Sequence, residues 1–207
     1  MSKTANRAYA ATLWISKFAY LNVLWIGFSL VGLVVLGFFP ATVAMFAVVR
    51  KWLLGDTDIP VFGTFWSTYK AEFIKSNGLG LILVVVGVLI VLDLFFIRNL
   101  SGSFVRAIQI PIYLFIFAAV MTLLYIFPVF VHYELKIVHM IKNSFLLMLI
   151  NPLENVVMVI SLVMVFFVVK YIPGLGFFFG GSLSAAIIMA ACYRTFQKTE
   201  RKKEQLG

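Results

Sequence analysis

Long apolar runs alternate with short polar stretches along the chain. The pattern predicts membrane-spanning helices at residues 18–39, 78–97, 107–131, 152–171 and 175–193, and a shorter apolar helix at residues 40–54. A helix rises 1.5 Å per residue and needs about 20 mainly apolar residues to cross the hydrocarbon layer. The sequence therefore predicts an all-α fold, a polytopic transmembrane helical bundle.

The stretch from Gly37 to Asp56 decides how often the chain crosses the membrane. The residue before a proline avoids helical geometry, and proline favours the first turn of a new helix. A turn at Gly37–Pro40 and a returning helix from Pro40 to Leu54 would give six membrane helices in three hairpins. A straight helix through Pro40 would give five. The returning helix would span only about 22 Å, which is short for a crossing.

The distribution of Lys and Arg favours six spans. Three basic residues precede residue 18, four lie at 50–75, two at 136–142 and five follow residue 193, which places 14 on one side and leaves 3 on the other. The five-span alternative gives 11 against 6. Because cytoplasmic loops are enriched in Lys and Arg, we expect both termini in the cytoplasm.

Two amphipathic segments, one between Pro60 and Lys75 and one at residues 137–150, are predicted to lie on the cytoplasmic membrane surface between the hairpins. Residues 1–17 are expected to form an interfacial segment, 18–193 the transmembrane bundle and 194–207 a basic cytoplasmic tail. The whole chain, 1–207, is expected to be one membrane domain.

The composition supports a membrane protein. The chain is 63% hydrophobic and 12% charged, with a mean hydropathy of +1.05, more apolar surface than a soluble core of this size can bury. The net charge is +9, and the basic residues that produce it lie at the ends of apolar runs. It therefore indicates anionic lipid headgroups as a partner and no nucleic acid. We expect Arg50, Lys51 and Trp52, which follow the turn at Pro40, to anchor the chain to anionic lipid at the cytoplasmic membrane surface.

Few residues suggest chemistry. Asp93 is an acid inside a predicted span, which can mark an ion path, although its place near Arg98 also fits an interfacial ion pair. His132 and His139 lie seven residues apart and could bind a metal ion, but the sequence offers no third metal ligand at suitable spacing. The sequence has no P-loop, dinucleotide fingerprint, nucleophile elbow or metalloprotease motif. We expect no catalytic, cofactor or metal site, and no enzymatic activity.

Small residues recur in the last predicted span, at Gly176, Gly180, Ser182, Ala186 and Ala190. Such a stripe lets helix backbones approach closely. It is expected either to pack within the chain or to face a partner.

One stretch of the chain resembles the YesL-like family of bacterial integral membrane proteins, a domain of unknown function. The matching residues are Asn22-Val23-Leu24-Trp25, Ser29-Leu30, Gly37, Pro40-Ala41-Thr42, Ala44, Val48-Val49-Arg50-Lys51, Phe65, Tyr69-Lys70, Phe73 and Lys75. The resemblance covers residues 15–80 well and the rest loosely. The acidic residues often found just after the Arg-Lys element come later here, as Asp56 and Asp58.

The resemblance implies an association with carbohydrate uptake, because such proteins are commonly encoded beside sugar ABC importers. We therefore expect an accessory subunit of a carbohydrate ABC import system in the bacterial cell membrane, docked on the importer's transmembrane subunits. Two alternatives remain open. One is a stand-alone transporter or channel lined by Asp93 and the amide of Asn22 or Asn155, and the other is a structural membrane scaffold.

Overall fold

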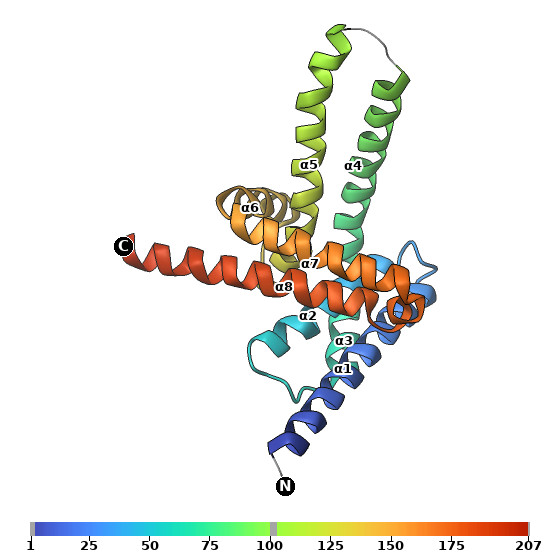
Figure 1. Ribbon diagram of the computed structural model, residues 1–207, viewed down its shortest axis with the longest axis vertical. Helices are drawn as coiled ribbons and strands as arrows, with labels where there is room; N and C mark the ends of the chain where they lie inside the picture. Colours follow the sequence, from blue (N-terminus) through green and yellow to red (C-terminus); the bar gives the residue numbers. More distant parts are fainter. Residues whose placement is uncertain (1–2, 100–102, 207) are drawn as a thin grey trace.

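The computed structural model describes residues 3–99 and 103–206, and these residues form helices without any strand (Figure 1). The helices are α1 (Lys3–Val31), α2 (Phe38–Leu53), α3 (Val61–Ala71), α4 (Phe73–Asn99), α5 (Ser103–His132), α6 (Ile137–Ile150), α7 (Pro152–Tyr171) and α8 (Pro173–Leu206). The predicted all-α fold is confirmed.

Five helices within the described part of the chain are long and apolar enough to cross a membrane. Their apolar segments are Tyr9–Val31, Phe73–Ile97, Gln109–His132, Pro152–Tyr171 and Pro173–Arg201. The chain is thus a multi-pass membrane protein. The sixth expected crossing, α2, has only 16 residues, so six spans in three hairpins stay a prediction.

The first span differs from the expected one at both ends. Residues 3–31 form one continuous helix, so no boundary near residue 17 separates a surface segment from a span. The helix ends at Val31, eight residues before the expected end at Phe39. At the other end of the chain, α8 continues through the expected tail to Leu206.

The chain reverses at residues 32–37, earlier than the turn expected at Pro40. Gly32 and Gly37 lie against each other, and a Cβ on Gly37 would lie 2.5 Å from the Ser29 carbonyl oxygen. Leu33 and Val34 adopt positive φ angles of 58° and 64°, a region that a β-branched residue such as valine rarely adopts. This turn therefore depends on two glycines with no room for a side chain.

Helix α2 lies at the centre of the molecule and packs against α1, α3, α4, α5 and α8. Its residues from Pro40 to Phe46 are buried, as are Val48, Val49 and Trp52. Figure 1 shows α4 and α5 rising side by side out of this region, while α7 and α8 run together across it. A short helix thus forms the core around which the longer helices are placed.

The first amphipathic segment is divided at Glu72, where α3 ends and α4 begins. Phe65 is fully buried and Tyr69 is 6% exposed, and both rings contact Phe28 of α1. The apolar face of α3 therefore packs on the protein. The second amphipathic segment forms α6 with the expected bounds.

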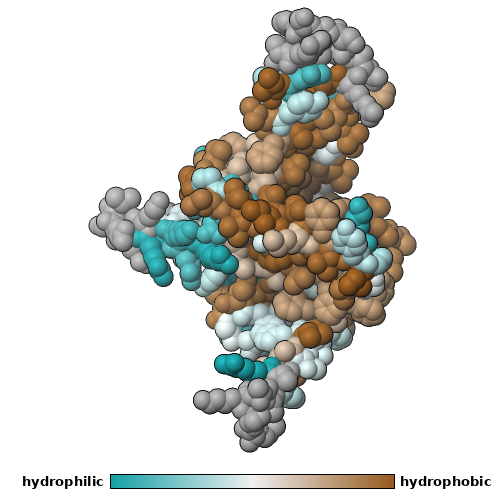
Figure 2. All heavy atoms as spheres, viewed as in Figure 1, coloured by the Kyte–Doolittle hydropathy of each residue, from teal (hydrophilic) through white to brown (hydrophobic). Residues whose placement is uncertain are grey.

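Apolar side chains cover much of the outside of the molecule (Figure 2). They include Val85, Val88 and Val91 on α4, and Tyr113 and Phe117 on α5. Surface of this kind must face lipid tails or another protein in the membrane.

Candidate functional site

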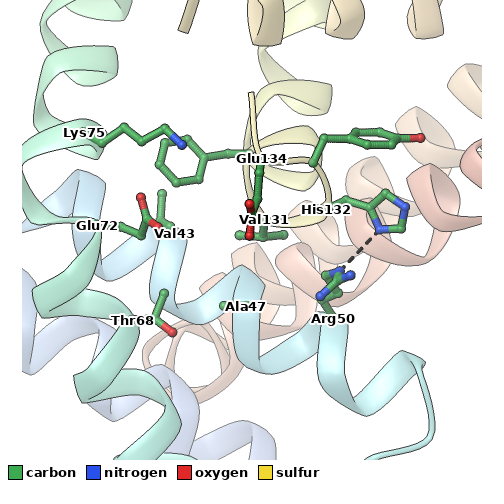
Figure 3. Close-up of a pocket in the computed structure, with 11 residues that line it drawn as sticks. Val43, Ala47, Arg50, Thr68, Glu72, Lys75, Val131, His132 and Glu134 are labelled. Carbon is green, nitrogen blue, oxygen red and sulfur yellow. Dashed lines mark hydrogen bonds between the residues drawn. The ribbon is translucent and has the colours of Figure 1, made fainter. Parts of the chain in front are cut away.

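Charged side chains from four parts of the chain surround a pocket of about 240 Å³ (Figure 3). Helix α2 supplies Arg50, the junction of α3 and α4 supplies Glu72, and α4 supplies Lys75. His132 ends α5, and Glu134 follows it. We call this site the charged pocket; its further lining residues are Val43, Ala47, Thr68, Phe130, Val131 and Tyr133.

His132 holds Arg50 at the wall of the charged pocket. The Arg50 Nε donates a hydrogen bond to Nδ1 of His132 over 3.3 Å, and the imidazole stacks on Phe196 of α8 with ring centroids 4.4 Å apart. Since Nδ1 accepts a hydrogen bond, the neutral imidazole carries its proton on Nε2. That atom faces the Glu200 carboxylate at 3.8 Å. The outer guanidinium nitrogens of Arg50 make no hydrogen bond to the described residues.

The opposite wall carries Lys75 and Glu72 (Figure 3). The Lys75 ammonium lies 4.9 Å from the centre of the Phe130 ring, a cation–π contact. Among the described residues, neither Glu72 nor Glu134 has an ion-pair or hydrogen-bond partner for its carboxylate. Two cations and two carboxylates therefore line one pocket with much of their bonding capacity unused.

Tyr133 also lines the charged pocket. Burial raises the pKa of this phenol, and the nearby Glu200 carboxylate raises it further. The Tyr133 hydroxyl therefore stays protonated at neutral pH and can donate a hydrogen bond.

A second charged cluster joins α7 to α8. The Glu154 side chain is 9% exposed, and it accepts a hydrogen bond of 2.7 Å from Lys198. Arg194 lies 3.9 Å from its other oxygen. A buried carboxylate needs such partners, so this cluster fixes the start of α7 on the C-terminal half of α8.

The two asparagines considered for a transport path bond to the protein itself. The Asn22 Nδ2 donates to the Phe177 carbonyl oxygen over 2.6 Å, and its Oδ1 accepts from the Ser182 amide over 2.9 Å. The Asn155 Oδ1 accepts from the Tyr125 hydroxyl over 2.6 Å, and its Nδ2 donates to the Met148 carbonyl. Both amides hold helices together.

The other predicted surface residues lie in different environments. Pro40 is buried in the first turn of α2, and Lys51 is exposed. Trp52 is buried between Trp14 and Phe18, so its ring lies inside the core and not at a lipid surface. Asp93 is exposed on α4, and its expected partner side chain, Arg98, lies outside the described side chains.

The small-residue stripe on α8 makes contacts within the chain at two positions. A Cβ added to Gly176 would lie 2.6 Å from Val169 of α7, and the Ser182 amide bonds to α1. A Cβ added to Gly180 would have no atom within 4 Å, while Ala186 and Ala190 are partly buried. The stripe thus faces α7 and α1 at these two positions.

Sequence reasoning missed the charged pocket. Glu72 and Lys75 belong to one segment, while Arg50 and Glu134 belong to two others, and the only local signal is that each lies beside the end of an apolar run. The histidine pair is also divided, since His132 belongs to α5 and His139 to α6. Among the described residues, no group of three or more His, Cys, Asp or Glu side chains could hold a metal ion.

The family model for DUF624, described as a protein of unknown function, matches residues 18–94. Three proteins of Bacillus subtilis (strain 168), each described as uncharacterized, are similar over nearly the whole chain. YteU is 40% identical, over 91% of this chain and 84% of the YteU chain. YesL is 38% identical, over 93% of this chain and 90% of the YesL chain. YesV is 35% identical over 96% of both. No solved structure matches. The chain therefore belongs to the YesL-like DUF624 family of membrane proteins.

Proposed function

We propose that the protein is a non-enzymatic accessory subunit that docks, within the bacterial cell membrane, on the transmembrane subunits of a carbohydrate ABC importer. The observation that supports docking is the α4–α5 pair, which projects from the rest of the molecule (Figure 1). Only 11% of the most apolar stretch of α4 is buried within the chain. A projecting pair of apolar helices can pack against helices of another membrane protein.

The choice of an importer as the partner rests on the family resemblance. An importer subunit with its own ATPase would supply the energy, since this sequence contains no P-loop. The exposed rings of Phe62 and Trp66 on α3 and the exposed Val138 on α6 offer further contact area beside the bundle. The excess of basic residues around these segments favours a cytoplasmic side for them and for both termini.

Co-purification with co-expressed importer permease subunits tests the proposal. The double variant Val88→Trp with Phe117→Ala changes the exposed surface of α4 and α5. We expect it to lower recovery of the permeases several-fold, because it both adds and removes volume at the contact. Its matched control is Val157→Trp with Phe166→Ala, the same changes at exposed positions on α7, which should leave recovery unchanged.

Two results would count against docking. One is recovery of the chain without any permease subunit, and the other is an equal effect of both double variants. Solute uptake by the purified chain alone in vesicles, lost in Asp93→Asn, would instead support the stand-alone transporter.

A further inference from the structure

The charged pocket lies at the ends of two candidate membrane spans. The apolar segment of α4 begins at Phe73, between Glu72 and Lys75, and that of α5 ends at His132, two residues before Glu134. Lipid headgroups lie at the depth where apolar segments end. The unpaired charges of the charged pocket are therefore placed where headgroups are present at high concentration.

An apolar groove of about 320 Å³ lies deeper along the same two helices. It runs between α4 and α5 and is closed on one side by α6, with Ile82, Val86, Phe115, Leu123, Ile141 and Phe145 in its walls. Its one hydroxyl, from Thr122, bonds to the Ala118 carbonyl of its own helix. We call it the apolar groove, and it presents almost only hydrocarbon to an occupant.

The spacing of the two sites fits an amphiphile. Lys75 and Ile82 are seven residues apart on α4, which is about 10 Å along a helix. Phe130 and Ile126, one turn apart on α5, line the charged pocket and the apolar groove respectively. A molecule with a polar head and a hydrocarbon tail could therefore occupy both sites along the α4–α5 pair.

The charges favour one kind of headgroup. The unused guanidinium nitrogens of Arg50 and the ammonium of Lys75 can donate to a phosphate. The free carboxylates of Glu72 and Glu134 would repel an anionic headgroup, but they can accept hydrogen bonds from a primary ammonium. A quaternary ammonium has no N–H group to donate. The pocket thus matches a zwitterion that carries a phosphate and a primary ammonium.

We propose that the charged pocket and the apolar groove together bind one phospholipid with a phosphate and a primary ammonium in its headgroup. Arg50 and Lys75 bind the phosphate, Glu72 and Glu134 bind the ammonium, and one acyl chain lies in the apolar groove. The lipid fills the space between α4 and α5 from the headgroup layer inward. This site does not depend on the proposed importer partner.

Native mass spectrometry of the detergent-purified chain tests the proposal by titration with defined lipids. We expect phosphatidylethanolamine to bind about tenfold more tightly than phosphatidylcholine or phosphatidylglycerol, the ratio that corresponds to 1.4 kcal/mol. Soluble phosphoethanolamine should bind at least tenfold more weakly than the lipid, because it cannot fill the apolar groove. Equal binding of the three lipids, or equally tight binding of phosphoethanolamine, would overturn the assignment.

Single substitutions separate the parts of the site. Glu72→Gln should remove the preference for phosphatidylethanolamine over phosphatidylcholine. Lys75→Gln should weaken the binding of both lipids several-fold. Val86→Trp should weaken lipid binding by filling the apolar groove. Lys142→Gln, an exposed lysine on α6 outside both sites, is the control and should bind lipid as the unmodified chain does. Unchanged binding in Lys75→Gln and Val86→Trp, with melting temperatures equal to that of the unmodified chain, would refute the site.

Discussion

Asn22 joins α1 to α8 with both ends of one side-chain amide. The residue is 1% exposed, and its amide donates to the Phe177 carbonyl and accepts from the Ser182 amide at once. Gly181 makes this approach possible, because a Cβ at that position would lie 2.9 Å from the Asn22 oxygen. Within a membrane, water cannot replace these hydrogen bonds, since it is absent from the hydrocarbon layer.

Asn22→Leu should therefore destabilise the protein. The substitution removes two hydrogen bonds between α1 and α8, and hydrogen bonds between membrane helices contribute on the order of 1 kcal/mol each. We expect a clear decrease in melting temperature in detergent, measured by intrinsic fluorescence. Tyr20→Leu, at an exposed position on the same helix, should have little effect. An equal melting temperature for Asn22→Leu would show that the clamp is not stabilising.

At the scale of elements, the turn between α1 and α2 is held by contacts from outside it. The Asn77 amide of α4 donates to the Leu36 carbonyl over 3.1 Å, and the Tyr69 hydroxyl of α3 lies 3.4 Å from the Phe28 carbonyl. Burial raises the pKa of Tyr69, so its hydroxyl remains a donor. The strained backbone at Leu33 and Val34 persists because α3 and α4 hold both sides of the turn.

Gly32→Ala and Gly37→Ala should both destabilise this turn, because an added methyl group would collide with backbone atoms across it. Gly27→Ala is the control, since a Cβ there meets no atom within 4 Å and alanine favours helix over glycine. We expect lower melting temperatures for the first two variants and an equal or higher one for Gly27→Ala. Three equal values would mean that the turn tolerates a side chain.

At the scale of the whole molecule, the number of crossings depends on α2. Arg7 lies just before the apolar segment of α1, and Asp58 lies after α2. Both are exposed, and they share one side of the membrane only if the chain returns through α2. The exposed Val35 lies in the turn between the two helices. These positions distinguish six spans from five.

Labelling with a membrane-impermeant thiol reagent in a Cys192→Ser background should modify Arg7→Cys and Asp58→Cys from the same side, and Val35→Cys from the other. Cys192 is fully buried, so it adds no signal from the folded protein. Tyr171→Cys, at the exposed end of α7, is the control, because both topologies place it opposite Asp58. Labelling of Arg7→Cys and Asp58→Cys from opposite sides would exclude the six-span topology.

Much of the fold follows from local sequence. The apolar runs predicted four of the five long helices nearly in place, and α6 in full, because length and hydropathy are properties of neighbouring residues. The turn before α2 was placed too late. Pro40 is the third residue of α2, where a helix leaves the N–H group unbonded, so the proline costs no hydrogen bond there.

The sequence by itself determined that this is a helical membrane protein with basic residues gathered at certain helix ends, since both properties are read along the chain. Only the tertiary structure decided that α2 is a buried core helix and that Trp52 packs inside it. It also decided that Arg50, Glu72, Lys75 and Glu134 line one pocket. The physical reason is that packing joins residues up to 84 positions apart, and periodicity within each segment carries no information about which segments will meet.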